Sequence, residues 1–210
     1  MQNSQLIKTN LGAISASLYV SFQLISNVLS TKIALLPFVN LATDAGTLLY
    51  PLTFTLRDFV HKTLGKKRSR QIVVLAGLIN LVMALLFLLV AKLTPDASWQ
   101  FQDAFEKILL PVWRITLASV ISQVVSELVD TEIFSWVYKK YSDVTAVLVS
   151  NTIALIVDSL VFSFLAFLGQ LPLSVVFQII VSNILIKFVM SVISSPVVKA
   201  VPRQVPVESI

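Results

Sequence analysis

Polar side chains recur at helical spacing inside the apolar stretch of residues 118–134. They are Ser119, Ser122, Gln123, Ser126, Glu127 and Asp130. At about 100° of rotation per residue, this set falls within an arc of about 140° on one face of a helix. Carboxylates accept N–H hydrogen bonds, and amides both donate and accept them. Such a face can therefore bind a polar ligand or an ion.

Other apolar segments carry similar polar residues on one face. They are Gln23, Asn27 and Ser30 near the N-terminus, Asn151 and Asp158 seven residues apart, and Asn183 and Lys187 four apart. A charged side chain at the centre of a bilayer costs about 2.5–3.5 kcal/mol even on the lenient insertion scale. We therefore expect these groups to face one another inside a helix bundle and to line a hydrated cavity.

Two structural alternatives compete with a ligand cavity. Buried serine and amide side chains often only join helices, at about 0.6 kcal/mol each, and a Lys187–Asp158 ion pair can be purely architectural. Helix joining alone does not require four ionisable groups at membrane depth, which Glu127, Asp130, Asp158 and Lys187 provide. Such groups usually mark a substrate or ion pathway, so we favour the cavity.

Composition and segment length predict an all-α integral membrane protein. Of the 210 residues, 56% are hydrophobic and only 13% are charged, against about 25% charged in soluble domains. A spanning helix needs about 20 apolar residues. We predict one domain, residues 1–210, with six transmembrane helices near 11–35, 45–61, 71–91, 113–137, 145–168 and 174–198. The second is short, contains Pro51 and ends at Arg57-Asp58, so we expect it to be broken or tilted.

The distribution of Lys and Arg predicts the orientation. Ten of the sixteen fall in segments on the side of the N-terminus and four on the other side, which predicts cytoplasmic termini, with tails at 1–10 and 200–210. The basic loop 65–70 (GKKRSR) is interpreted as a topology anchor beside anionic lipid, and no nucleic-acid partner is predicted. The outer loop 92–111 contains an amphipathic segment, interpreted as an interfacial helix or a lid.

Several catalytic classes lack the residues they need. The chain has no cysteine, and its single histidine, His61, lies at the end of the second predicted span. That leaves no His cluster for a metal protease and no Ser–His pair at membrane depth. With five glycines in all, no phosphate-binding loop is present. We predict no enzyme, no cofactor and no metal site, and nothing resembles the selectivity filter of a channel.

Four further motifs carry a resemblance to a known family. They are YPLTFTLRDFVHKTLGKKRSRQ (50–71), ASVISQVVSELVDTEIF (118–134), SNTIALIVDSLVFSFLAFLG (150–169) and IKFVMSVISSP (186–196), and Ser26-Asn27 precedes them. In order and spacing the chain resembles the bacterial queuosine-precursor transporters, also called the vitamin-uptake-transporter group. The resemblance implies a six-helix importer of a 7-deazaguanine base in the bacterial cell membrane. It also implies an architecture similar to the substrate-binding subunits of energy-coupling-factor transporters.

The family pattern carries over at a defined set of positions: Pro51, Asp58, Gly65, Arg68, Asp130, Phe134, Asp158, Phe162 and Lys187. Many relatives have an acidic residue a few positions after Asp58, where this chain has His61 and Lys62, so that role is not carried over. A guanine-like ring offers N–H donors beside a carbonyl acceptor, and aromatic faces can stack on it. The resulting substrate-binding prediction comprises Glu127, Asp130, Gln123, Asn27, Asn151, Asp158, Asn183, Lys187, Phe162 and Tyr50, with Phe134 and Trp113 as further ring candidates.

Individual roles and the energy source complete the prediction. Glu127 is favoured for base recognition because of its depth, Asp158 and Lys187 for the cavity wall or gating, and Arg57 and Asp58 for closing the cytoplasmic end. Either the chain is a stand-alone carrier, or it docks on a shared ATP-driven module and binds another vitamin-like molecule. Small residues could pack against such a partner or within the bundle: Gly12 with Ala16, and Ala13 with Ser17.

Overall fold

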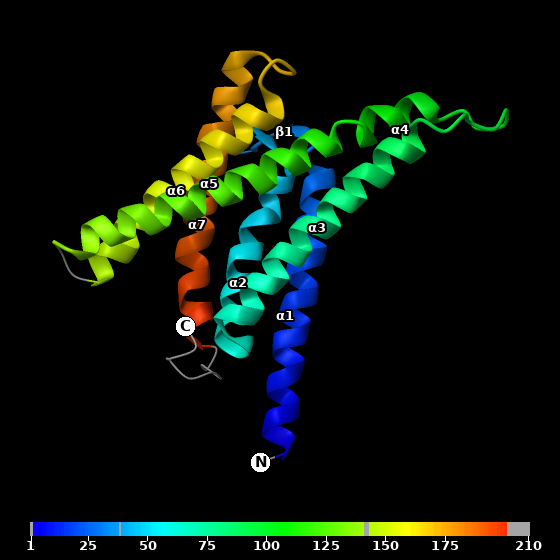
Figure 1. The fold of residues 1–210 in the computed structure, drawn as a ribbon. Coiled ribbons are helices and arrows are strands. Elements are labelled where there is room, and N and C mark those ends of the chain that lie inside the picture. The colour runs from blue at the N-terminus through cyan, green and yellow to red at the C-terminus, as the bar shows by residue number, and fades with distance from the viewer. Residues whose placement is uncertain (1, 38, 141–142, 201–210) are drawn as a thin grey trace.

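The computed structural model describes the backbone of residues 2–37, 39–140 and 143–200 and the side chains of 11–37, 39–133, 135–137, 139–140 and 149–193. Helices dominate this part of the chain, with one small hairpin between the first two (Figure 1). In order, the elements are α1 (Gln2–Leu29), β1 (Ile33–Leu35), β2 (Ala42–Asp44), the 3₁₀ helix η1 (Ala45–Leu48), α2 (Tyr50–Leu64), α3 (Lys66–Ala91), α4 (Gln102–Leu109), α5 (Val112–Tyr138), α6 (Asp143–Phe167) and α7 (Leu173–Ala200).

Five helices within the described residues are long and apolar enough to cross a membrane. Their apolar stretches are Leu11–Leu29, Lys66–Ala91, Gln102–Val137, Val149–Phe167 and Leu173–Ile193. These stretches correspond to five of the six predicted spans, and they confirm an all-α membrane protein. The predicted second span is different, because α2 has 15 residues. At 1.5 Å per residue it extends over only about 22 Å, less than the roughly 30 Å of a hydrocarbon core.

A short antiparallel hairpin precedes α2 and was not predicted from the sequence. Ile33 pairs with Asp44 and Leu35 with Ala42, so α1 ends at Leu29 rather than near residue 35. Non-helical backbone is tolerated near a membrane when its polar groups are satisfied by protein. The amide of Ala42 donates to Oε1 of Gln178 at 3.0 Å, and Ser182 Oγ donates to the carbonyl of Ala42 at 2.8 Å. Helix α7 therefore completes the hydrogen bonding of β2.

The turn between α2 and α3 depends on one glycine. Pro51 lies in the first turn of α2, where its missing N–H removes no helical bond. Gly65 adopts φ 85°, the left-handed region that glycine enters at little cost, and it separates the two helices. The N-terminal end of α1, the C-terminal end of α7 and this turn lie toward one end of the bundle, while the hairpin and α4 lie toward the other (Figure 1). The basic segment 65–70 therefore lies at the same end as the start of α1 and the end of α7.

The predicted amphipathic segment of the outer loop forms the helix α4. Trp99 packs edge-on against Phe101 and Phe105, with ring centroids 5.6 and 6.4 Å apart. In the preceding turn, the amide and hydroxyl of Ser98 both donate to Asp96 Oδ1, which lowers the pKa of that carboxyl. The loop therefore has local order of its own, as an interfacial anchor needs.

A cluster of buried apolar side chains lies near the hairpin, where α5, α6 and α7 meet β2. This cluster comprises Ala42, Ile115, Ala118, Ala166, Phe167, Val176, Ile179 and Ile180. Beside it, the guanidinium of Arg114 donates to the carbonyls of Leu165 and Leu168 at 2.7 and 2.6 Å. These contacts satisfy carbonyls at the C-terminal end of α6. The cluster therefore packs α5, α6 and α7 against the hairpin.

Candidate functional site

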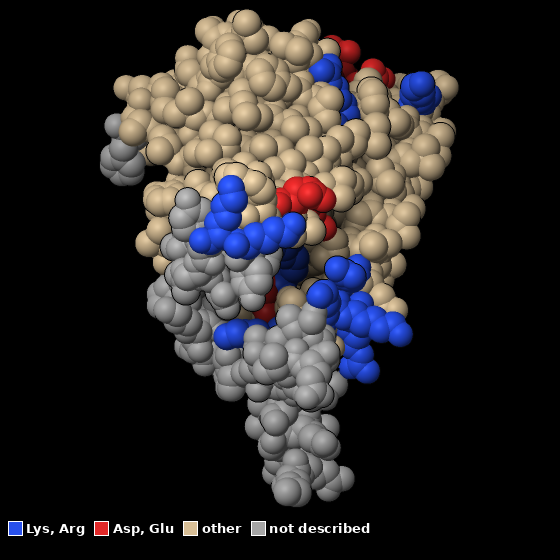
Figure 2. Space-filling model, turned by 60° about the vertical axis from the view of Figure 1, so that its left-hand side comes forward, with Lys and Arg blue, Asp and Glu red and all other residues tan. Residues whose placement is uncertain are grey.

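A polar cavity of about 290 Å³ lies among α2, α5, α6 and α7. This volume is at the small end of the roughly 300–1,000 Å³ found for ligand sites. A hollow flanked by lysine and arginine side chains is visible on the face shown in Figure 2. The lining residues are Tyr50, Pro51, Phe54, Thr55, Arg57, Asp58, Gln123, Ser126, Glu127, Asp130, Asn151, Ala154, Leu155, Asp158, Lys187 and Ser191. The structure thus brings together nine of the twelve residues predicted for binding or gating.

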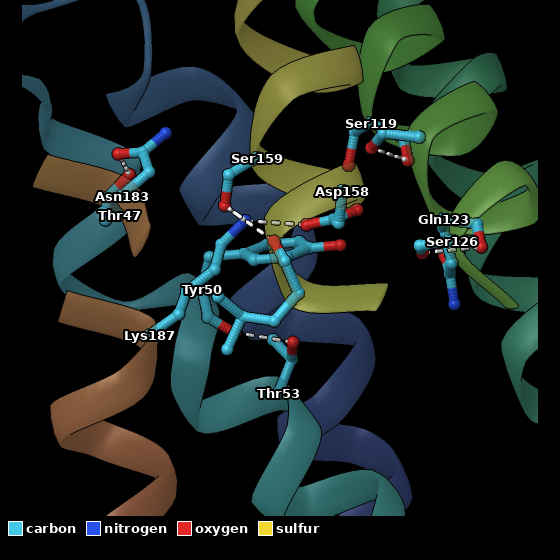
Figure 3. Close-up of polar contacts among 12 residues, drawn as sticks. Thr47, Tyr50, Thr53, Ser119, Gln123, Ser126, Asp158, Ser159, Asn183 and Lys187 are labelled. Atoms are coloured by element: carbon cyan, nitrogen blue, oxygen red, sulfur yellow. Dashed lines mark hydrogen bonds and ion pairs between the residues drawn. The ribbon is translucent and has the colours of Figure 1, made fainter. Parts of the chain in front are cut away.

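A buried ion pair forms the inner wall of this cavity. Lys187 Nζ lies 2.6 Å from Asp158 Oδ2, and the two side chains are only 4% and 7% exposed. The same ammonium donates to Ser159 Oγ at 3.1 Å and lies 5.7 Å from the centroid of the Tyr50 ring (Figure 3). Several hydrogen bonds of this kind compensate for removing the two charges from water. The Lys187–Asp158 ion pair, which the sequence raised as an architectural alternative to a ligand cavity, is present in the structure.

A second ion pair lies toward the open side of the cavity. Arg57 Nη1 lies 3.1 Å from Glu127 Oε1, and the side chains are 34% and 55% exposed. The guanidinium also lies 5.8 Å from the centroid of the Phe54 ring, which in turn packs edge-on against Tyr50. Because Glu127 is already paired with Arg57, a ligand that binds Glu127 must either share it with Arg57 or displace Arg57.

Asp130 presents an acceptor that no described residue satisfies. Its Oδ1 atom is buried and has no hydrogen-bond partner within the described residues, although the carboxyl lines the cavity. A buried oxygen of this kind costs free energy unless a donor reaches it. Gln123 lies about two turns away from Asp130 on the same face of α5 and also lines the cavity, as does Asn151 of α6. Carboxylate and amide groups therefore face one space.

A smaller cavity of about 20 Å³ lies on the other side of the Lys187–Asp158 pair. Tyr50, Asp158 and Lys187 line both cavities, and Figure 3 shows them between the Thr47–Asn183 contact and the Gln123 and Ser126 side chains. The other lining residues are Ser26, Asn27, Ser30, Asp44, Thr47, Ser119, Ser122, Phe162 and Asn183. The three remaining predicted binding residues, Asn27, Asn183 and Phe162, therefore lie in this second space.

Asp44 is a buried carboxylate that the sequence prediction missed. It is 1% exposed and caps η1 through Thr47 N at 3.1 Å. Ser30 Oγ donates to Oδ1 at 2.7 Å, and Asn183 Nδ2 donates to Oδ2 at 3.0 Å. The capping pattern in TDAGT (43–47) was a usable signal, because Asp is a preferred cap residue. Its partners on α1 and α7 are distant in sequence and gave no such signal.

Other predicted residues serve different purposes or lie elsewhere. Asn27 Nδ2 donates to Asn80 Oδ1 at 2.6 Å, which joins α1 to α3. Phe162 packs edge-on against Phe167 at 5.8 Å and so belongs partly to the apolar core. Trp113, a ring candidate, is 43% exposed and lies outside the lining of both cavities. The side chain of Phe134 lies outside the described residues.

Five long apolar helices around enclosed polar groups define a multi-pass membrane protein of the solute-carrying class. Comparison with known proteins agrees with this class. Residues 44–201 match the family described as "Putative vitamin uptake transporter", and because the match covers most of the chain, the protein belongs to that family. It is therefore a transporter of the bacterial cell membrane, a class that moves a solute rather than converting one.

One curated relative comes from Bacillus subtilis (strain 168) and is named "Probable queuosine precursor transporter". It is 26% identical over 171 residues, which cover 80% of this chain and 75% of the relative. No solved structure matches the chain.

Proposed function

We propose that this protein imports a queuosine precursor or a queuine-type 7-deazaguanine base, which binds in the larger polar cavity. The observation that carries the proposal is the buried, unsatisfied oxygen of Asp130, which faces a space also lined by amide groups and aromatic rings. The name of the Bacillus relative supports the same substrate class.

The chemistry of the lining matches the edge of a guanine-like ring. That edge presents adjacent N–H donors beside a carbonyl oxygen. The Asp130 carboxylate accepts the donors, and an amide of Gln123 or Asn151 donates to the carbonyl. Tyr50 or Phe54 supplies a flat face for stacking, worth about 1–3 kcal/mol per base. Glu127 is a second candidate acceptor, once Arg57 has moved away from it.

We further propose how the chain crosses the membrane. The hairpin, η1 and α2 together form the remaining crossing, and α7 satisfies the backbone of the hairpin within it. With this unit the chain has six crossings and places both termini on the cytoplasmic side, as the Lys and Arg bias predicts. Arg57 and Asp58 then lie at the cytoplasmic mouth of the cavity and close it.

Direct binding tests the substrate class. The purified chain is titrated with the cyano base, the aminomethyl base, queuine and the nucleoside, and at least one should bind saturably. Asp130→Asn should weaken that binding roughly 10- to 100-fold, because hydrogen bonds to a charged group contribute about 1.5–3 kcal/mol. Asp103→Asn is the matched control, since Asp103 lies on exposed α4. Wild-type affinity in the Asp130 variant, or no binding by any compound, refutes the proposal.

The energy source is a separate question, and the surface of α1 bears on it. A Cβ atom on Gly12 would lie 2.6 Å from Leu64 Cδ2, so this glycine packs against α2 within the bundle. We propose that the chain works as a stand-alone carrier without an ATP-driven module. Uptake of labelled base in a host that lacks any such module tests this: uptake above the vector control supports it, and none refutes it.

A further inference from the structure

The small cavity around Asp44 has the features of a binding site for one small cation. Asp44 is 1% exposed, and no lysine or arginine among the described side chains lies within ion-pair distance of it. The nearby Asp158 is already paired with Lys187. The lining of the cavity therefore contains two carboxylates and one ammonium group, and one further positive charge would make its net charge zero.

The hydroxyl of Thr47 has two acceptor oxygens within hydrogen-bond distance but only one hydrogen to donate. Its Oγ1 is 2.7 Å from Asp44 Oδ2 and 2.6 Å from Asn183 Oδ1. A threonine hydroxyl has one hydrogen and two lone pairs, so it donates to one of these oxygens and leaves the other contact without a hydrogen. Short contacts between oxygens are relieved when a cation binds to them.

Ser26 supplies an independent observation that points to a ligand. Its side chain is 1% exposed and lines the small cavity, and its Oγ atom has no hydrogen-bond partner in the described part of the chain. A buried hydroxyl normally has a partner. The unsatisfied oxygen of Ser26 and the surplus acceptors around Thr47 line one space of about 20 Å³, enough for one water-sized species.

The backbone near this space is closely packed, which fixes the oxygens in place. A Cβ atom on Gly46 would lie 2.1 Å from Ser30 Oγ and 2.3 Å from the carbonyl oxygen of Ser26. Only glycine therefore allows η1 to approach the end of α1 this closely. Ends of helices beside non-helical backbone are where carriers commonly bind coupling ions.

We propose that the small cavity binds one sodium ion through oxygens of Asp44, Ser26 and Thr47. Among the described residues there is no group of three or more His, Asp or Glu side chains able to hold a metal ion. The donors around the small cavity are one free carboxylate and neutral oxygens, which suit a hard monovalent cation better than a transition metal. Because Tyr50, Asp158 and Lys187 line both cavities, sodium can also influence the larger one; that coupling rests on the proposed transport function.

Binding of ²²Na⁺ to the purified full-length chain, with no base present, tests the site. Wild-type protein should bind about one ion per chain saturably, and Asp44→Asn should abolish this binding. Since Asp44→Asn can also disturb folding, Ser26→Ala provides the sharper test. It removes an oxygen that bonds to no described residue, so melting temperature without sodium should not fall, whereas sodium affinity should drop at least about fivefold. Asp103→Asn is the matched control and should bind sodium like the wild type.

The outcomes separate this site from the proposed substrate. No saturable sodium binding by wild-type protein refutes the site, as does wild-type affinity in both the Ser26 and Asp44 variants. If the small cavity holds a water molecule or a coupled proton instead of sodium, the wild-type protein will show no saturable sodium binding. If sodium binds as expected but no deazaguanine binds, the cation site stands and the proposed substrate fails. Base affinity measured in sodium and in choline chloride then tests the coupling, and equal affinities refute it.

Discussion

The two ion pairs that line the large cavity use similar chemistry in different surroundings. Lys187 and Asp158 lie 2.6 Å apart with side chains 4% and 7% exposed. Arg57 and Glu127 lie 3.1 Å apart with side chains 34% and 55% exposed. A third pair, Asp103 and Lys107 on α4, is 77–93% exposed and lies outside the cavity.

Exposure decides what each pair contributes to the protein. Water screens an exposed pair and competes for its charges, so its contribution to stability is small. A buried pair contributes little net stability either, yet breaking it leaves one charge uncompensated. The inner pair therefore stabilises the wall that the two cavities share, while the outer pair can separate and re-form with little effect on the stability of the fold. The inner pair is thus suited to a structural role and the outer pair to a gate.

The largest effect is expected from removing the inner cation. Lys187→Met leaves Asp158 as an unpaired buried carboxylate, which should lower the free energy of unfolding by about 3–5 kcal/mol. Thermal unfolding of the purified protein in detergent measures the loss. A melting temperature within a degree of the wild type would show that the pair is dispensable for the fold.

A double replacement separates the architectural role of the inner pair from a functional one. Asp158→Leu combined with Lys187→Met removes both charges and keeps similar volume, so most of the lost stability should return. If the pair also serves transport, the double variant should not take up the base even though its stability returns. If both stability and uptake return, the pair has only a structural role, which is the alternative that the sequence left open.

The outer pair should affect transport more than stability. Glu127→Gln removes the negative charge that pairs with Arg57, and at this exposure the change in unfolding free energy should be about 0.2–1 kcal/mol. Uptake should fall several-fold, because Glu127 lines the cavity and Arg57 loses the charge of its partner at the proposed gate. Initial rates of uptake, normalised to protein in the membrane, measure this. An uptake rate equal to the wild type would remove the gate from the proposal.

The polar stripe on α5 could be predicted because it depends only on helical rotation. Gln123, Glu127 and Asp130 do share one cavity, as their spacing requires. The partner of Glu127, however, lies 70 residues away on a helix that the sequence marked only as short and broken. Pairing over such a separation depends on how the helices pack, which hydropathy does not specify.

Asp44 shows a second limit of the sequence. It lies at the end of a strand in a hairpin that interrupts two apolar segments, where a search for spanning helices places a helix boundary. Its contact with Asn183 joins residues 139 positions apart. Hydrogen bonds with Gln178 and Ser182 of α7 help to stabilise the hairpin, and local propensity gives no sign of these distant partners.

The smallest effect is expected at α4, and it completes the comparison. Lys107→Ala removes the partner of Asp103 in a pair that is 77–93% exposed and 3.3 Å apart. Water replaces the lost contact at both ends, so the melting temperature and uptake should stay at wild-type values. A fall in uptake without loss of stability would contradict the rule that the effect of breaking an ion pair decreases as its exposure increases. It would assign α4 the role of a lid rather than that of an interfacial anchor.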